Sequence, residues 1–282
     1  MAGGRWQAHR RGAAHRPTAT SHDRIQATSF GVEGHALLSH RRRVVVTGIG
    51  AVSPLGNGAS ETWNAMLAGR SGIAPFTLFD AASFAVRIGG EVKNLQVPPA
   101  VNPKTARRLD RNVLFALAAA DEALADAALP IGVGNRDRIG CVCGTAMGGI
   151  KTLLDGQRTL DERGPDRVGA HVMTNFHPST AAAEIAITFG ARGHNVAVVS
   201  ACATGGHALG EAAEVIRRGD AVAMIAGATE ACLVPIVLAA FINMRALAGC
   251  DQDPASASKP FDARRRGFVL AEGAAVMVLE DA

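Results

Sequence analysis

The sequence contains no tyrosine, and aromatic residues make up only 4% of its 282 residues. A hydrophobic core therefore has to be built mainly from Ala, Val, Ile and Leu, which are plentiful because the hydrophobic fraction is 48%. The 32 glycines indicate close backbone packing and frequent turns between strands and helices. This composition favours an α/β architecture over a β-sandwich or a helical bundle.

Long apolar runs are also missing. No stretch reaches the length of about 18 residues that a membrane span needs, so we predict no transmembrane helix and no membrane partner. Residues 1–42 lack the continuous apolar core of a signal peptide. They are rich in Arg, Ser, Thr and Ala and poor in acids, so we interpret them as a basic, disordered extension before a domain at residues 43–282. An organellar transit peptide is the less favoured alternative.

The excess of positive charge is confined to this first segment. The net charge is +4, but residues 1–42 contain seven arginines against Asp23 and Glu33, which leaves the other 240 residues at −1. The basic residues are not interleaved with aromatic ones that could stack on bases. We therefore expect no nucleic-acid partner.

The cysteines lack the spacing of a disulfide framework, and their odd count argues against a secreted scaffold. Cys141 and Cys143 form a C-x-C pair, which is weak as a metal motif and fits one face of an apolar strand better. We expect reduced thiols, a cytoplasmic location and no metal site. The five cysteines are Cys141, Cys143, Cys202, Cys232 and Cys250.

Strand and helix patterns alternate from residue 43 onward. Residues 44–47 predict a buried strand, and Gly48 and Gly50 predict the start of a loop before a helix that ends near Gly69. Residues 105–129 predict one long helix, buried on much of its circumference. Later strands are expected at 137–149, 195–201, 221–230 and 267–282, with helices at 180–190 and 205–219. The strand–helix–strand order implies a parallel crossover.

The segment SACATGG places Cys202 where a strand ends and a helix begins. A helix N-terminus favours an anion and hence the thiolate, and ligands of open α/β folds bind at the carboxyl edge of the sheet. Gly205 and Gly206 leave space for a substrate, and the N–H of Cys202 is a candidate oxyanion donor. Spacing alone leaves a nucleophile and an inert core cysteine equally open. We interpret His207, one turn later, as structural.

Three long motifs then identify a resemblance: RRVVVTGIGAVSPLGN, SACATGGHALGEAAEVIRRGDAVAMIAGATE and SKPFDARRRGFVLAEGAAVMVLE. Together they resemble the β-ketoacyl-acyl-carrier-protein synthases, most of all the type II elongating enzymes of fatty-acid synthesis. The resemblance runs from Arg42 to Ala282. It implies the first βαβαβ-type half of a thiolase-like α/β fold, with a mixed sheet covered by helices and the second half largely missing. It also implies a homodimer.

The resemblance also implies a chemistry for Cys202. In that family the matching cysteine accepts an acyl chain from acyl carrier protein as a thioester. Malonyl-acyl-carrier-protein is then decarboxylated for a Claisen condensation with that acyl group. The related non-catalytic chain-length factors carry glutamine at the nucleophile position, so Cys202 argues against them. No bound cofactor is implied, because the acyl and malonyl thioesters arrive on the phosphopantetheine of the carrier protein.

Further positions match family residues of the acyl pocket or of the surface that docks the acidic carrier protein. Each is also readable as ordinary packing or as solvated surface charge. The resemblance implies pocket roles for Met147 and Phe241, and docking roles for Lys104, Arg107, Arg108 and Arg245.

The family's decarboxylation machinery is missing from this sequence. Its two histidines and nearby lysine belong to motifs such as HGTGT and GHxxGAAG, which do not occur here. We therefore expect residues 1–282 to be incomplete for condensation, as in a truncated copy or a split gene. The alternatives are a polyketide ketosynthase of the same chemistry, or a non-catalytic fragment that binds acyl carrier protein.

Overall fold

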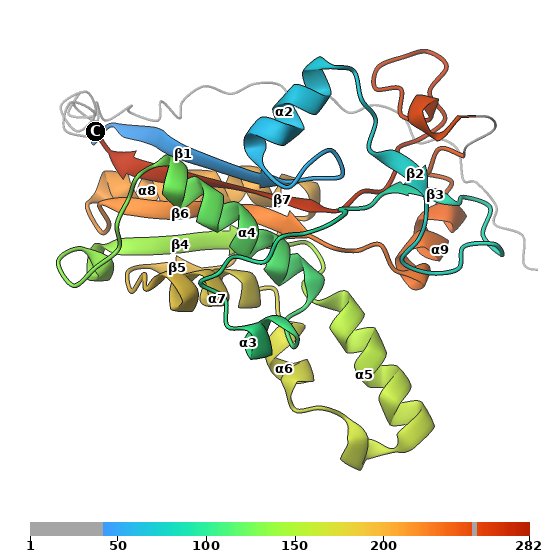
Figure 1. The fold of residues 1–282 in the computed structure, drawn as a ribbon, viewed down its shortest axis with the longest axis horizontal. Helices are drawn as coiled ribbons and strands as arrows, with labels where there is room; N and C mark the ends of the chain where they lie inside the picture. The colour runs from blue at the N-terminus through green and yellow to red at the C-terminus, as the bar shows by residue number, and fades with distance from the viewer. Residues whose placement is uncertain (1–41, 250–252) are drawn as a thin grey trace, which may run out of the picture. The chain divides into compact units, whose positions relative to one another are not determined.

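The structure is a computed structural model that describes residues 42–249 and 253–282. The expected extension at residues 1–42 lies outside the described residues except for Arg42. Within the described part, five strands form one sheet in the order β1-β7-β6-β4-β5 (Figure 1). β4, β5 and β6 are parallel, whereas β7 is antiparallel to both of its neighbours, so the predicted mixed sheet is confirmed. The strands are β1 (Val44–Val52), β4 (Ile139–Gly144), β5 (Asn195–Val196), β6 (Ala223–Glu230) and β7 (Gly273–Asp281).

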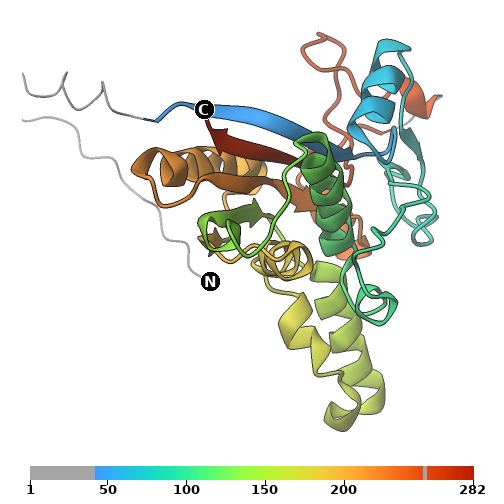
Figure 2. The ribbon, with the colours of Figure 1, turned by 60° about the vertical axis from the view of Figure 1, so that its left-hand side comes forward.

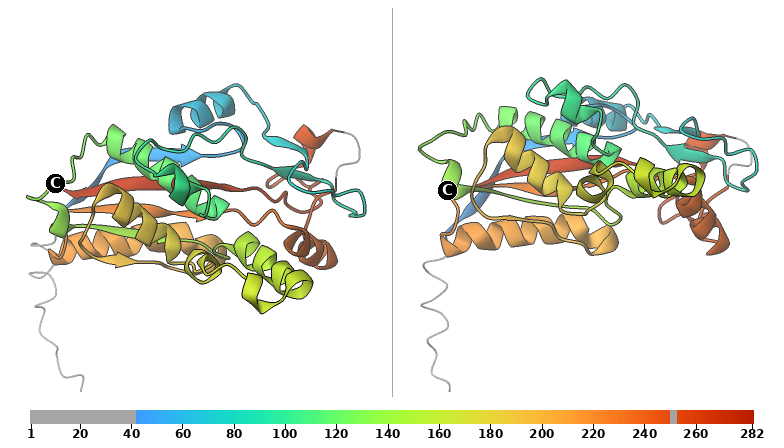
Figure 3. Two further views of the ribbon diagram at one scale, coloured as in Figure 1. Left: turned by 60° about the horizontal axis from the view of Figure 1, so that its bottom comes forward. Right: turned by 90° about the horizontal axis from the view of Figure 1, so that it is seen from below.

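Helices cover both faces of this sheet. α4 (Arg111–Asp126) and α7 (Thr180–Phe189) pack on one face, and α8 (Thr204–Arg218) packs on the other (Figure 3). β4 shows why both faces are apolar, because Cys141 and Cys143 join the core with α4 while Val142 joins the core with α8. The expectation that the C-x-C pair serves one face of a strand is therefore confirmed.

The remaining elements lie around the carboxyl ends of the parallel strands and beside β1. α5 and α6 lie side by side beyond the end of β4 (Figure 2). Among the described residues, no helix combines the length and the apolar character that a membrane span requires. The elements are α2 (Ala59–Leu67), β2 (Ile73–Pro75), β3 (Ile88–Gly90), α3 (Pro103–Ala106), α5 (Ile150–Arg163), α6 (His171–Asn175) and α9 (Pro235–Asn243).

The long helix expected at 105–129 is in fact two helices, α3 and α4. Asp110 separates them as the N-cap of α4, where its carboxylate lies 3.4 Å from the N–H of Asn112. The same carboxylate accepts hydrogen bonds from the N–H and the hydroxyl of Thr152 at the start of α5, at 2.9 and 2.7 Å. An aspartate that satisfies free N–H groups favours the start of a new helix over continuation of the old one. The predicted burial of α4 is confirmed.

β1 is longer than predicted, because Gly48 and Gly50 lie within the strand and not in a loop. α4 crosses the strand at these two residues. A Cβ on Gly48 would lie 2.0 Å from the carbonyl oxygen of Ala123, and one on Gly50 would lie 1.9 Å from that of Ala119. Glycine is thus required by the close approach of a helix backbone and not by a turn.

The outer edge of β1 is fastened to α4 by two carboxylates. Asp126 accepts the N–H of Ile49 at 2.9 Å, and Glu122 accepts the N–H of Ala51 at 2.9 Å. Glu122 also accepts the N–H of Ala59, the first residue of α2, at 2.8 Å. These bonds satisfy N–H groups that an edge strand and a helix start would otherwise leave unpaired.

β5 is much shorter than the strand expected at 195–201. Only Asn195 and Val196 pair with β4, and the chain then continues beside β4 without a ladder. The backbone then turns, with ψ at 42° in Ser200 and φ at +51° in Ala201. This early turn delivers the chain to the first residue of α8 at the carboxyl edge of the sheet.

Candidate active site around Cys202

Cys202 lies in a single 3-10 turn, Ala201–Ala203, that leads directly into α8. The turn follows β5, so the cysteine lies at the junction of strand and helix that the sequence predicts. The N-terminus of α8 carries free N–H groups and the positive end of the helix dipole, both of which favour an anion.

Among the described cysteines, Cys202 is the exposed one. Burial raises the pKa of Cys143 and of Cys232 to about 12, and it raises the pKa of Cys141 well above its usual value. These three side chains therefore remain neutral thiols inside the core. Cys250 lies outside the described residues, and within them no cluster of His, Cys, Asp and Glu forms a metal site.

The surface next to Cys202 is open. Gly206 could carry a Cβ without meeting any atom within 4 Å, whereas a Cβ on Gly205 would lie 3.5 Å from that of Ala228. Beside the turn, α8 and the end of β5 enclose a hollow of about 560 Å³. Its lining residues are Val196, Val198, Gly206, His207, Gly210 and Glu211.

His207 contacts the turn itself, since its Nδ1 atom lies 2.7 Å from the hydroxyl oxygen of Ser200. This contact agrees with the structural role expected for the histidine. The hydroxyl of Thr204, the first residue of α8, bonds to the same turn through Ser200 and Ala201. Ser200 and Thr204 were not singled out from the sequence, because neither has a spacing that signals this contact.

Met147 and Phe241, the predicted pocket residues, pack against the same apolar cluster. Met147 follows β4, and Phe241 lies on α9, where its ring meets that of Phe268 edge-on at 5.4 Å between centroids. The structure thus places both residues against one apolar cluster, and their roles toward a substrate stay predictions. The cluster's buried members are Val86, Ile88, Cys232, Leu233, Val234, Val237, Leu238, Leu247 and Leu270.

Glu230, at the end of β6, fixes the turn that carries Met147. Its carboxylate accepts the N–H of Ala146 at 2.9 Å and the hydroxyl of Thr145 at 3.2 Å. Burial raises the pKa of the Glu230 carboxyl, although these hydrogen bonds oppose that rise. The sequence signal for this residue is an acid directly after the apolar run AVAMIAGAT.

The basic residues predicted to dock a carrier protein are all exposed. Lys104 lies on α3, with Arg107 and Arg108 directly after it, and Arg245 follows α9 with a φ of +56°. Their exposure is compatible with docking and also with solvated surface charge. Their role therefore stays a prediction.

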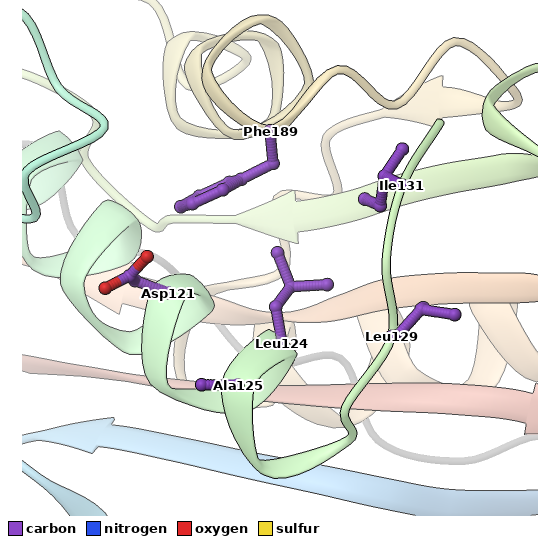
Figure 4. A pocket seen from close by; sticks show the side chains of 6 residues that line it. All are labelled: Asp121, Leu124, Ala125, Leu129, Ile131 and Phe189. Atoms are coloured by element: carbon purple, nitrogen blue, oxygen red, sulfur yellow. The ribbon is translucent and has the colours of Figure 1, made fainter. Parts of the chain in front are cut away.

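A second hollow lies far along the sheet from the turn, between α4, α7 and the loop before β4 (Figure 4). It measures about 290 Å³, and Asp121 is its one charged lining residue. Burial raises the pKa of the Asp121 carboxyl. No cysteine, serine, threonine or histidine lines this hollow, so the candidate active site is at Cys202. The other lining residues are Leu124, Ala125, Leu129, Ile131 and Phe189.

Fold and site together define an α/β protein with an exposed cysteine at a strand–helix turn. The family model described as "Beta-ketoacyl synthase, N-terminal domain" matches residues 41–282. The chain therefore belongs to the β-ketoacyl synthase family, as the motifs predicted.

Curated relatives agree with this assignment. The chain is 42% identical to 3-oxoacyl-[acyl-carrier-protein] synthase 2 of Synechocystis sp. over 241 residues, which cover 86% of this chain and 58% of the relative. It is 41% identical to the protein of that name from Staphylococcus aureus over 243 residues, with the same coverage. The chain thus spans about 58% of the length of these relatives.

Solved structures confirm the predicted thiolase-like fold class. A β-ketoacyl synthase from Burkholderia phymatum matches with a TM-score of 0.77 and 30% identity, over 86% of this chain and 59% of the other. A type II polyketide ketosynthase, solved in complex with its acyl-carrier protein and bound to a hexaketide, matches with a TM-score of 0.72 and 32% identity. That match covers 86% of this chain and 58% of the other.

Proposed function

We propose that this protein is an acyltransferase of fatty-acid elongation, in which Cys202 accepts an acyl chain from acyl carrier protein. The Cys202 thiolate attacks the thioester carbonyl, a new sulfur–carbon bond forms, and the phosphopantetheine thiolate leaves and takes up a proton. The observation that carries this proposal is the exposed Cys202 at the N-terminus of α8, in a chain of the ketosynthase family. The helix N-terminus favours the attacking thiolate, and the N–H of Cys202 is the candidate donor to the oxyanion.

Condensation with malonyl-acyl-carrier-protein needs groups that stabilise the decarboxylation transition state. The histidine motifs of the family do not occur in residues 1–282, so this polypeptide is expected to form the acyl-enzyme but not to turn over. A complementing polypeptide that carries HGTxT and GHxxGAAG motifs is expected to restore condensation.

The proposed partner is acyl carrier protein, because a structural neighbour was solved in complex with its own carrier protein. Lys104, Arg107, Arg108 and Arg245 are the proposed docking residues, and Met147 and Phe241 the proposed pocket residues. Charge complementarity of this kind mainly accelerates encounter and weakens with salt. We further propose a homodimer that works in the reducing cytoplasm, with no bound cofactor.

Polyketide synthesis is the second candidate, favoured by the ketosynthase neighbour bound to a hexaketide. The curated relatives at 41–42% identity are named 3-oxoacyl-[acyl-carrier-protein] synthase 2, which favours fatty-acid elongation. A non-catalytic fragment that only binds acyl carrier protein is the third possibility, and the exposed thiol argues against it.

Transfer of an acyl group to Cys202 tests the proposal directly. The chain is incubated with acyl carrier protein loaded with an acyl group, and the adduct is located by peptide mass spectrometry. We expect the adduct on Cys202, none on Cys232, and no adduct in C202S. The variant C250S serves as the matched control for Cys250, the cysteine that lies outside the described residues. Stable binding of carrier protein without transfer would favour the non-catalytic alternative, and labelling independent of Cys202 would overturn the proposal.

A further inference from the structure

The residue before Cys202 adopts a backbone conformation that side chains disfavour. Ala201 has a φ of +51°, in the left-handed region that favours glycine. Such a conformation persists only where the surrounding structure over-determines it, and these residues concentrate at functional sites. The backbone of Ala201 sets the direction of the next residue, so whatever holds Ala201 also aims the thiol of Cys202.

The hydroxyl of Thr204 is the first group that fixes the conformation of this turn. This side chain is buried, with 3% of the residue exposed. Its oxygen accepts the N–H of Ser200 at 2.9 Å and donates to the carbonyl of Ala201 at 2.7 Å. One hydroxyl therefore bridges the two sides of the strained residue, and both bonds need an atom that donates and accepts at once.

The contact between Ser200 and His207 is the second interaction that fixes the turn. The Nδ1 atom of His207 lies 2.7 Å from the Ser200 hydroxyl oxygen, which ties the start of the turn to the first full turn of α8. Ser200 also accepts the N–H of Ala203 through its carbonyl at 3.1 Å. The turn is thus connected to α8 both from inside, by Thr204, and from the exposed side, by His207.

We propose that Thr204 and His207 are positioning residues, which hold Ala201 in its strained conformation and thereby keep the Cys202 sulfur at the N-terminus of α8. The inference rests on the proposed function, because it assigns supports to the nucleophile of that function. Loss of either support lets Ala201 relax to negative φ, which moves the exposed sulfur from its place at the strand–helix turn. The thiol is then less well placed for attack and reacts more slowly.

The alkylation rate of Cys202 by iodoacetamide at a fixed neutral pH measures this effect without requiring acyl transfer. T204V keeps the volume of the side chain but removes the hydroxyl, whereas T204S keeps the hydroxyl. We expect alkylation to fall on the order of tenfold in T204V and to recover most of the loss in T204S. T180V is the matched control, because Thr180 also begins a helix, is buried, and donates its hydroxyl to a carbonyl at 2.7 Å.

Two substitutions separate the Nδ1 contact of His207 from its bulk. The amide of asparagine falls near the position of Nδ1, whereas that of glutamine falls near the position of Nε2. H207N is therefore expected to retain most of the alkylation rate, and H207Q to lose on the order of tenfold. A201G in the H207Q background is expected to recover part of the rate, since glycine adopts positive φ without strain.

Unfolding curves recorded for each variant show whether it is folded before rates are compared. Equal alkylation rates in T204V, H207Q and the wild type would overturn the inference, as would a slow H207N. Acyl transfer to the wild type is measured separately. If the wild type is not acylated while the alkylation pattern holds, the proposed function fails and the positioning role stands. If acylation occurs while all variants react equally, only the positioning role fails.

Discussion

Substitution of Gly50 by alanine is the most direct test of how the sheet and its helical cover fit together. Gly50 lies in β1 directly beneath α4, and the new Cβ would lie 1.9 Å from the carbonyl oxygen of Ala119 and 2.8 Å from the N–H nitrogen of Ala123. Both atoms are helix backbone, so no side-chain rotation relieves the contact. α4 would have to move away from the strand by roughly 1 Å, and it is tied to the core through most of its length.

The free energies involved also predict that G50A destabilises the fold. Overpacking of a core costs about 1–3 kcal/mol, and a clash with backbone belongs at the upper end of this range. Alanine recovers about 0.5–1 kcal/mol of chain entropy relative to glycine in a strand. We therefore expect G50A to lower the free energy of unfolding by about 2 kcal/mol.

Urea unfolding followed by far-ultraviolet circular dichroism measures this difference, with an unchanged slope against urea as the sign of two comparable transitions. G210A is the matched control, because Gly210 lies inside α8, is exposed, and could carry a Cβ without any atom within 4 Å. We expect G210A to be more stable than the wild type by about 0.5–1 kcal/mol. A G50A protein as stable as the wild type would refute the claim that α4 requires glycine in β1.

Three further substitutions test the polar contacts that join the elements. Burial raises the pKa of the Glu91 carboxyl, but hydrogen bonds from Thr77 and Leu78, together with the charge of Arg111, outweigh this and leave the pKa below its usual value of 4.5. The contribution of Glu91 to stability is therefore present above that value and is lost as the pH falls below it. E91Q should flatten the dependence of unfolding free energy on pH between about pH 5 and 3. R111M leaves the carboxylate of Glu272, whose side chain is 1% exposed, without its charged partner. It should therefore lower the free energy of unfolding, measured in urea, by about 3 kcal/mol. The double variant R111M/E272Q should recover part of this loss. E122A removes the acceptor of N–H groups in β1 and α2 and should lower the free energy of unfolding, measured by thermal unfolding, by about 1–2 kcal/mol, with E122Q intermediate.

The sequence was sufficient to predict the elements whose own residues determine them. β6 and β7 are apolar and rich in small or β-branched residues, and α7 ends at Gly190 in the left-handed conformation. It failed where a distant contact decides the local structure. In the sequence Gly48 resembles a turn glycine, but it lies within a strand because α4 crosses it. Asp110 resembles an ordinary helix residue, but in the fold it caps α4 and bonds to Thr152.

The candidate site also combines features that the local sequence determines with features that depend on contacts in the fold. Cys202 could be found because the switch from strand to helix and the following glycines are visible in the local sequence. The contacts around it could not, because hydrogen bonds join Ser200, Thr204 and His207 at a turn in which Ala201 has a positive φ. Positive φ in an alanine leaves no trace in the sequence, since alanine ordinarily avoids it.

The geometry of the site also depends on the core behind it. A Cβ on Gly144, the last residue of β4, would lie 2.4 Å from the methyl carbon of Thr204 and 2.1 Å from the carbonyl oxygen of Val198. Glycine at this position therefore allows the Thr204 side chain to pack directly against the end of β4. In this position its hydroxyl bonds to Ser200 and Ala201. Packing at the end of β4 therefore contributes to the geometry of the turn that carries the exposed thiol.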